Sequence, residues 1–584
     1  MSTSADREFG GHLLVKCLLA QGVTHVFGVP GESYLAVLDG FYQYRDDIRF
    51  IINRQEGGAA FMAEAHGKLT GRPGVCFVTR GPGATNASIG LHTAFQDSTP
   101  MVMFVGDVAG SMRDREAFQE VNYLSFFGPS TKGMAKLVER IDQVERIPEY
   151  VSRAFATAMN GRRGPVVLVL PEDMLTEPVP LDASGQGPRA FAQADVVETG
   201  IPARSAAALR DLLFNAERPL VIAGGSGWTP QAARDLQSFA EKWSLPVANA
   251  FRFQDTFDNH HPLYVGDVGL GINPALGKRI TQSDLILAIG PRLGEITSGS
   301  YALIAAPQPT QALVHIHTSA DELNRVFQTR LAIHAGMPAA AEALAALHPP
   351  GRIRWQEWSQ SCHQDYLANT RIASMASLPE DTSQGLVNMP SVIATLQKHL
   401  PPDAVLTNGA GNFASWLHRY FRYHGLVKGQ KTQLAPTNGA MGYGVPAGIA
   451  AAITTGRTVV TLAGDGDFLM TGQELATAAQ HGAKSIVIVL NNGMYGTIRM
   501  HQEREYPTHV SGSSLANPDF AALARAYGFA GVRIGRSDEF EAVFLEALAR
   551  SQGTLIEIIQ EPQAITTRAT LNDIRQAALK RKSS

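Results

Sequence analysis

The chain has 584 residues, which corresponds to about three or four domains at roughly 150 residues each and excludes a small disulfide-stapled module. The 50 basic and 53 acidic residues give a net charge of −3, which argues against a surface built to bind nucleic acid. Only 18% of the residues are charged, and 56 are glycines. Low charge and frequent glycine indicate much buried surface and backbone turns close to ligands, so we expect a cofactor-dependent enzyme with subunit interfaces.

Cysteine usage and hydropathy indicate a cytoplasmic protein. Cys17, Cys76 and Cys362 have neither disulfide-framework nor metal-type spacing, and the first residues lack the basic and apolar regions of a secretory signal. A long uncharged run, residues 432–456, contains two prolines and five glycines. We therefore expect a loop and a buried helix there, and no membrane span.

Short apolar runs alternate with helical patterns in three blocks, as in parallel strands covered on both faces. The expected strands are 23–27, 50–52, 75–78, 101–105 and 166–170, then 220–222, 285–289 and 312–316, and finally 404–406, 459–462, 486–490 and 555–559. Turn-forming residues at 178–188 and an irregular stretch at about 345–390 separate the blocks. We predict an α/β fold of three doubly wound domains with mainly parallel sheets, at 1–180, 190–345 and 375–584.

Two polar clusters follow successive strands of the third block. Gly464-Asp465-Gly466-Asp467 ends one strand, and Asn491-Asn492 ends the next, with Asn492 27 residues after Asp465. Parallel strands bring their carboxyl ends to one edge of a sheet, where ligands bind. Asp465 and Asn492 would supply the carboxylate and amide oxygens that Mg²⁺ prefers.

The helix between these clusters has its own expected start and end. Thr471 and Glu474 have the spacing of a capping box, and Gly482 is placed to end the helix.

Each of the two polar clusters alone is typical of an ordinary turn, but together they resemble the signature of thiamine diphosphate (thiamine pyrophosphate) enzymes. This resemblance implies that Met494 lends its backbone carbonyl to the metal. It also implies that the amides of Gly466 and Asp467 approach the cofactor's diphosphate.

A single glutamate is implied as the activating acid. Glu56 stands at an expected strand-to-helix junction, followed by small residues. In isolation it would be a carboxylate that favours a helix N-terminus. In the thiamine diphosphate family, however, the acid that hydrogen-bonds the cofactor's pyrimidine ring occupies this Glu-Gly-x-Ala-x-x-Met-Ala context, followed by Gly-Pro-Gly-Ala-Thr-Asn, here residues 81–86. Glu56 is therefore the expected catalytic acid.

The resemblance places further cofactor contacts in the third block. Met441 would hold the two cofactor rings folded against each other, its alternative being a core side chain. The Gly439 carbonyl would accept from the cofactor's amino group, and Gly411 and Asn412 would lie at the diphosphate. Pyrimidine-binding and diphosphate-binding domains of the family meet across a subunit interface, which implies a homodimer or homotetramer.

Nearly the whole chain is similar to the large subunit of acetohydroxyacid (acetolactate) synthase, through segments 26–31, 81–86, 117–120, 164–171 and 439–446. The implied reaction is decarboxylation of a 2-oxo acid and addition of the resulting enamine to a second carbonyl compound. Phe118 and Gln119 match residues beside the cofactor, and the alternative is an exposed cluster at a helix start.

Departures from the synthase pattern leave the acceptor substrate open. Met500-His501 stands where synthases carry Gln-Trp, and Glu172 reverses the charge of a family lysine near the active-site entrance. FAD is left open as well. Arg162 and Arg292 match flavin-contacting arginines, but either residue would also suit a plain surface position.

The leading hypothesis is a thiamine diphosphate- and Mg²⁺-dependent carboligase, a transferase or lyase acting on small molecules. The alternatives are a non-ligating 2-oxo acid decarboxylase, a flavin-linked oxidase on the same scaffold, or a regulatory paralogue that binds the cofactor without turnover. An NAD-dependent protein is disfavoured because no Gly-x-Gly-x-x-Gly turn with a following acid is present.

Overall fold

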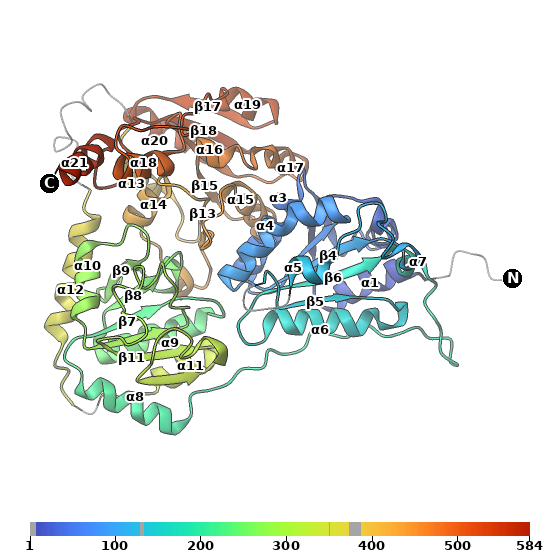
Figure 1. The fold of residues 1–584 in the computed structure, drawn as a ribbon, viewed down its shortest axis with the longest axis horizontal. Coiled ribbons are helices and arrows are strands. Elements are labelled where there is room, and N and C mark those ends of the chain that lie inside the picture. The colour runs from blue at the N-terminus through green and yellow to red at the C-terminus, as the bar shows by residue number, and fades with distance from the viewer. Residues whose placement is uncertain (1–7, 129–132, 350, 373–386, 584) are drawn as a thin grey trace. The chain divides into compact units, whose positions relative to one another are not determined.

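The computed structural model describes residues 8–128, 133–349, 351–372 and 387–583. It contains three six-stranded sheets, in which every paired strand is parallel and helices cover the faces (Figure 1). The predicted fold class is confirmed. The predicted start of the third domain, residue 375, lies outside the described residues.

The described residues cluster into two compact units. The first comprises residues 8–197 together with 449–455 and 473–482, and the second holds the remaining described residues from 198 onward. The first sheet belongs to the first unit, and the second and third sheets belong to the second unit.

The first sheet has the strand order β2-β1-β3-β4-β6-β5. Its strands are β1 (His25–Gly28), β2 (Arg49–Ile52), β3 (Gly74–Val78), β4 (Met101–Asp107), β5 (Leu137–Arg140) and β6 (Pro165–Pro171). The helices of this part are α1 (Gly10–Ala20), α2 (Leu35–Gln43), α3 (Glu56–Thr70), α4 (Gly81–Asp97), α5 (Tyr123–Phe127), α6 (Ile147–Met159) and α7 (Glu172–Thr176). Figure 1 shows α3 and α4 on the side of this sheet opposite to α6.

Small residues let α3 and α4 lie against each other. A Cβ atom built on Gly90 of α4 would come within 2.4 Å of the Ala60 side chain on α3. Only glycine fits that position, so the run of small residues after Glu56 serves helix packing beside the expected acid.

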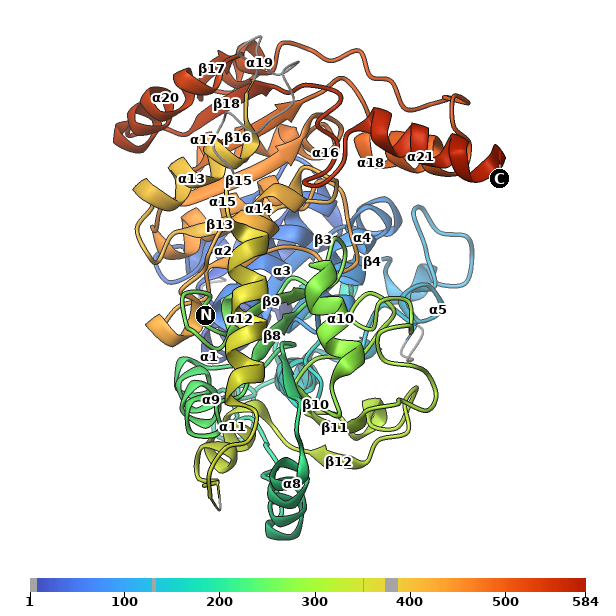
Figure 2. The same cartoon turned by 90° about the vertical axis from the view of Figure 1, so that its left-hand side faces the viewer.

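The middle sheet has the order β12-β11-β10-β7-β8-β9, the arrangement of dinucleotide-binding folds. Its strands are β7 (Pro219–Ala223), β8 (Val247–Ala250), β9 (Tyr264–Val268), β10 (Leu285–Ile289), β11 (Ala312–His317) and β12 (Leu331–His334). Its helices are α8 (Ala203–Asn215), α9 (Pro230–Trp243), α10 (Pro274–Gln282), α11 (Met337–Ala345) and α12 (Gln356–Thr370). Figure 2 shows α10 and α12 side by side next to β9.

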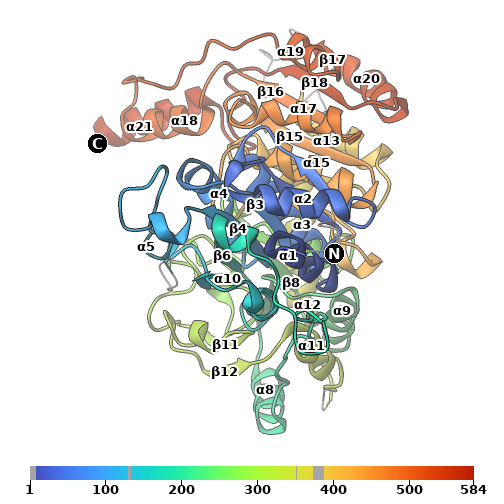
Figure 3. The same cartoon turned by 90° about the vertical axis from the view of Figure 1, so that its right-hand side faces the viewer.

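The third sheet, β14-β13-β15-β16-β18-β17, repeats the topology of the first. Its strands are β13 (Val405–Asn408), β14 (Gln433–Leu434), β15 (Val459–Gly464), β16 (Ile486–Asn491), β17 (Ala530–Ile534) and β18 (Thr554–Ile559). The helices are α13 (Met389–His399), α14 (Ala414–Tyr420), α15 (Gly444–Thr455), α16 (Asp465–Phe468), α17 (Leu475–Gln480), α18 (Gly496–Glu505), α19 (Phe520–Ala526), α20 (Ser537–Ala549) and α21 (Leu571–Ser583). The last helix, α21, lies along α18 (Figure 3).

The strand order of the third sheet locates a ligand site. From β13 the chain moves outward to β14 and then returns to β15 on the other side of β13. At such a reversal the loops that follow the two central strands diverge and leave a crevice at their carboxyl ends. The loops concerned follow Asn408 and Gly464.

Two local predictions were wrong. The stretch predicted to be irregular contains α12. The buried residues Trp355, just before this helix, and Cys362 and Tyr366 within it recur at helical spacing, a signal that the sequence carried. The capping box is absent, because the Glu474 side chain makes no cap bond and the Thr471 hydroxyl donates to the Gly442 carbonyl at 2.6 Å. Gly482 does follow α17, with a φ of +66°.

Cys17, Cys76 and Cys362 are free and buried. Among the described residues, no helix combines the length and apolarity needed to cross a membrane.

Candidate functional site

A cavity of about 230 Å³ lies where β13, β15 and β16 end, at the topological reversal. All nine residues predicted to hold the diphosphate, metal and cofactor rings in the third block line it. They are Gly411, Asn412, Gly439, Met441, Asp465, Gly466, Asp467, Asn492 and Met494. The fold therefore gathers side chains and backbone from four separate loops around one space.

Asp465 begins α16 directly after β15 and is fixed from three sides. Its Oδ1 accepts from the Gly466 amide at 2.9 Å, and its Oδ2 accepts from the Gly493 amide at 2.8 Å and from Asn517 Nδ2 at 2.7 Å. Burial raises the pKa of Asp465, and these hydrogen bonds oppose that rise by favouring the charged form. The result is a rigid carboxylate at the cavity wall, and sequence reasoning missed its partner Asn517.

The two adjacent asparagines have different tasks. Asn491 donates to the buried Glu557 at 2.8 Å and accepts from Asn517 at 2.9 Å, so it braces the end of β16. Asn492 lines the cavity, and its Oδ1 accepts from the Met494 amide at 3.2 Å. Carboxylate, amide and carbonyl oxygens from Asp465, Asn492 and Met494 form a donor set that fits a hard cation such as Mg²⁺.

Asp467 connects loops through its carboxylate, a role that sequence reasoning missed. Its Oδ1 accepts from the amides of Ala410 at 3.1 Å and Gly442 at 2.8 Å. Its Oδ2 is buried and makes no hydrogen bond within the described part of the chain. Burial raises the pKa of Asp467 to about 7. A Cβ on Gly409 would lie 2.0 Å from Oδ1, so glycine is required there for the loops to close around this carboxylate.

The Gly411-Asn412 loop is held by its neighbours. Cβ atoms on Gly411 and Gly464 would lie 2.7 and 2.8 Å from the Phe413 ring, which covers both glycines. The Asn412 amide donates to Thr497 Oγ1 at 3.0 Å, and its Nδ2 approaches the Met500 sulfur at 3.3 Å. Met500, which departs from the synthase pattern, thus positions Asn412.

Glu56 starts α3 just beyond the carboxyl end of β2, at the predicted strand-to-helix junction. Its Oε2 accepts from Asn86 Nδ2 at 3.0 Å, and Asn86 belongs to the predicted 81–86 motif. The preceding residue, Gln55, caps α3 by accepting from the Gly58 amide at 3.0 Å. The carboxylate is half-buried and held by the Asn86 side chain.

A second carboxylate supports this junction, and sequence reasoning assigned it to a helix cap instead. Glu474, fully buried, accepts from the amides of Arg54 at 3.1 Å and Gln55 at 3.0 Å and from Asn53 Nδ2 at 3.1 Å. Burial raises its pKa, and these bonds counteract that rise. Glu474 thereby fixes the backbone that leads into Glu56.

Phe118 and Gln119 lie in a loop that precedes α5. Phe118 is 72% exposed, and Gln119 has a φ of +65°. The Gln119 carbonyl accepts from the Gly81 amide at 3.0 Å, which joins this loop to the start of α4. Neither residue lies at a helix start, because α5 begins at Tyr123. Their role beside a cofactor stays a prediction.

The charge reversal at Glu172 is neutralised within the first unit. Arg80 donates to Glu32 at 2.8 Å and to Glu172 at 2.6 Å. These three residues follow β3, β1 and β6 and so share the carboxyl edge of the first sheet.

The two arginines considered for flavin differ in their surroundings. Arg162 donates to Ser98 Oγ at 2.9 Å and to the Phe95 carbonyl at 2.5 Å, and its guanidinium lies over the Phe95 ring. Arg162 is therefore engaged inside the first unit, and its contact with a flavin stays a prediction. Arg292 follows β10 at the reversal between β7 and β10, a position where a doubly wound sheet binds ligands.

Comparison with known proteins agrees with the three-part architecture. Three thiamine pyrophosphate enzyme models match: the N-terminal TPP binding domain at residues 9–126, the central domain at 206–344 and the C-terminal TPP binding domain at 409–558. The acetolactate synthase large subunit of Parasynechococcus marenigrum is 30% identical over 563 residues, covering 94% of this chain and 87% of the relative. The acetolactate synthase isozyme 2 large subunit of Escherichia coli is 29% identical over 546 residues, covering 93% of this chain and 94% of the relative. This chain therefore belongs to the thiamine pyrophosphate enzyme family.

Proposed function

We propose that the protein catalyses thiamine diphosphate- and Mg²⁺-dependent decarboxylation of a 2-oxo acid and ligation of the remaining unit to a second carbonyl compound. The observation that carries this proposal is the single cavity lined by all nine residues expected from the cofactor signature. Relatives named acetolactate synthase that align over more than nine-tenths of the chain support the reaction class.

Each group of predicted site residues has a proposed role that follows from its chemistry. Asp465, Asn492 and the Met494 carbonyl would hold Mg²⁺, and the backbone of the 411–412 and 466–467 turns would face the diphosphate. When bound, the cofactor supplies a nucleophilic carbon and an electron sink for loss of CO₂. Glu56 would share a proton with the pyrimidine ring nitrogen, while Asn86 keeps its carboxylate oriented.

The direct test of catalysis is product analysis after incubation with pyruvate. Acetolactate or acetoin indicates ligation, acetaldehyde indicates simple decarboxylation, and hydrogen peroxide indicates oxidase activity. Glu56→Gln should lower turnover at least ~10²-fold, the low end of general acid–base contributions. Glu145→Gln, an exposed residue of the same unit, should leave turnover unchanged. Normal turnover in Glu56→Gln would refute the catalytic assignment, and cofactor binding without any product would favour a regulatory paralogue.

We also propose a homodimer or homotetramer in which Glu56 and Asp465 of different protomers serve one cofactor. The test mixes inactive Glu56→Gln and Asp465→Asn chains and lets them reassort. Sites shared between protomers would recover about a quarter of the wild-type activity, because half of the dimers are mixed and each has one intact site. Sites built within single chains would recover none.

For the middle domain, a flavin is the second candidate cofactor, supported by the strand order of its sheet and by Arg292 at the strand reversal. A visible absorption spectrum of the purified protein tests it. Flavin absorption that is present in the wild type and lost in Arg292→Ala would support the flavin site. If the wild type shows no flavin absorption after incubation with FAD, the proposal of a flavin site is wrong.

A further inference from the structure

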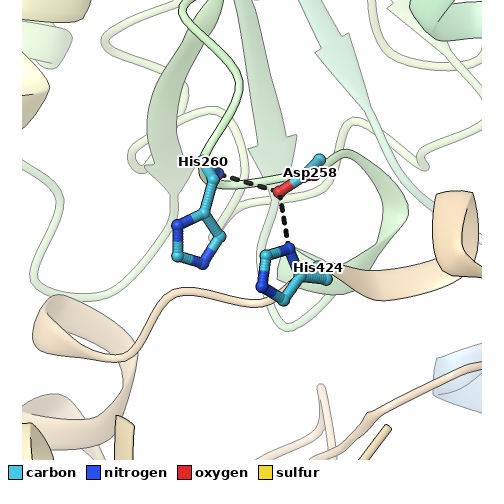
Figure 4. Close-up of side chains that lie close together, drawn as sticks. All are labelled: Asp258, His260 and His424. Carbon is cyan, nitrogen blue, oxygen red and sulfur yellow. Dashed lines mark hydrogen bonds and ion pairs between the residues drawn. The ribbon is translucent and has the colours of Figure 1, made fainter. Parts of the chain in front are cut away.

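Two histidines and an aspartate form a cluster outside the cofactor cavity (Figure 4). Asp258 and His260 lie between the short helix Gln254–Thr256 and β9, and His424 lies between α14 and the short helix Gly425–Lys428. One ligand-type atom of each residue lies within 4.8 Å of the other two. We call these three residues the Asp-His-His cluster.

Backbone contacts next to the cluster hold its two segments together. The Asn259 amide donates to the Tyr423 carbonyl at 2.8 Å, and the Tyr423 amide donates to Asn259 Oδ1 at 3.0 Å. Asn259 Nδ2 also donates to the carbonyls of Gln254 and Phe257, at 2.8 and 2.9 Å. Asn259 is buried and stands between Asp258 and His260, while Tyr423 directly precedes His424. The segments that carry the cluster are therefore preorganised, which reduces the entropy lost on ligand binding.

The spacing inside the cluster leaves room for an ion. His424 Nδ1 lies 3.5 Å from Asp258 Oδ1, and this buried nitrogen makes no hydrogen bond within the described part of the chain. Two ligand atoms that each lie ~2.1 Å from a tetrahedral metal ion are about 3.4 Å apart. The observed separation is thus long for a hydrogen bond and suitable for two ligands of one ion.

The rings of His260 and His424 are stacked, with centroids 4.1 Å apart and planes at 13°.

Binding one ion requires one ring to turn, because a metal lies in the plane of each imidazole that it contacts. His260 is the exposed ring, and its only contact through Nε2 that the structure shows, to the Arg422 carbonyl, is long at 3.3 Å. Rotation of His260 therefore breaks one long hydrogen bond and the stacking on His424, while His424 and Asp258 stay in place.

We propose that the Asp-His-His cluster binds a divalent transition metal ion such as Zn²⁺ through one nitrogen of each imidazole and the Asp258 carboxylate, with water completing the coordination. Imidazole ligands select Zn²⁺ or Co²⁺ over Mg²⁺, which distinguishes this ion from the one expected at Asp465. The ion would join a segment of the middle domain to a segment of the C-terminal domain, both within the second unit. Its role is structural, and no step of the proposed reaction depends on it.

The test uses the full-length protein loaded with thiamine diphosphate and Mg²⁺, stripped of transition metals by dialysis against a chelator and returned to Mg²⁺. Zn²⁺ is titrated by calorimetry, and Co²⁺ is titrated by its visible ligand-field absorption. We expect one site per chain in the micromolar range or tighter that excess Mg²⁺ does not displace, and a rise in melting temperature on Zn²⁺ addition.

Three variants complete the test. His260→Asn and His424→Asn should each weaken Zn²⁺ binding at least ~10-fold and abolish the Co²⁺ absorption of this site. His509→Asn removes an exposed histidine of the same unit and should change nothing. Because His260 is exposed, His260→Asn should fold and can test metal binding at the cluster even if His424→Asn fails to fold. Absence of Zn²⁺ binding to the wild type, or unchanged binding in His260→Asn, would overturn the proposal.

Discussion

Glu474 accepts a hydrogen bond from the backbone amide of Gln55 at 3.0 Å, one residue before Glu56. More than four hundred residues separate the two partners in sequence, yet both belong to the first compact unit. The junction that presents the expected catalytic acid is therefore built from two distant parts of the chain. Glu474 acts here as a positioning residue.

Glu474→Ala should disturb catalysis through Glu56. The change leaves the partly buried amide donors of Arg54 and Gln55 unpaired, each costing at most ~1–3 kcal/mol of unfolding free energy. Because the backbone before Glu56 then shifts, we expect kcat to fall and the pH profile of kcat to move. Urea unfolding and pH-dependent kinetics measure both effects. Glu474→Gln keeps one acceptor oxygen, so its stability and kcat should lie between those of the wild type and of Glu474→Ala. A normal pH profile in Glu474→Ala would contradict the positioning role.

Two variants of Asp467 should show whether its hydrogen bonds hold the loops around the cavity. Asp467→Asn keeps an acceptor for the amides of Ala410 and Gly442 and gives the buried Oδ2 position a neutral group. Asp467→Ala removes the acceptor, so the loops around the cavity separate. We expect Mg²⁺ and cofactor binding about 10–100-fold weaker in Asp467→Ala, the range for groups that orient metal ligands, and only mildly weaker in Asp467→Asn. Equal binding by both variants, measured by calorimetry, would show that the carboxylate does not hold these loops.

His66 should make the first unit sensitive to acid. Burial, and next the positive neighbours His25 and Arg72, lower the pKa of His66 to about 4. The unfolded chain, with an ordinary pKa near ~6.5, binds this proton more readily. Folding stability is therefore fully present above pH ~6.5 and falls as the pH drops toward about 4, by up to about 3 kcal/mol.

The His66 prediction is measured by urea unfolding of wild type and His66→Gln between neutral and acidic pH. Gln can still bond to Thr454, the partner of the imidazole at 3.0 Å. The variant should lose less stability in acid than the wild type, while the exposed His348→Gln should follow the wild type. Identical pH dependence in wild type and His66→Gln would contradict the assignment.

Arg575 should hold the last helix in place. Its guanidinium donates two hydrogen bonds to Glu503, at 2.7 and 2.6 Å. These hydrogen bonds are the main reason that the pKa of the buried Glu503 is lowered to about 2. Arg575→Ala removes a bidentate contact between α18 and α21, although Arg499 continues to pair with Glu503. We expect faster amide hydrogen exchange across Leu571–Ser583 and a lower melting temperature. Lys580→Ala on the same helix serves as control, and unchanged exchange in Arg575→Ala would show that other contacts hold α21.

Local patterns in the sequence were sufficient for much of the architecture. Long apolar strands such as Met101–Asp107 and Pro165–Pro171 are buried along their whole length, so their composition alone reveals covered parallel strands. The shorter or more polar strands Leu137–Arg140 and Ala530–Ile534 were missed, because neighbouring strands rather than their own residues stabilise them.

The same division holds for the candidate site. The Gly-Asp-Gly and Asn-Asn clusters could be recognised because each follows a strand directly, and parallel strands must end at one edge. The supporting groups Glu474, Asn517 and the Asp467 carboxylate could not, since each is defined by partners distant in the chain. Hydrogen bonds between remote segments leave no periodicity in either segment. The sequence by itself determined which elements form and where their polar ends lie, and the tertiary structure decided which buried carboxylates hold those ends together.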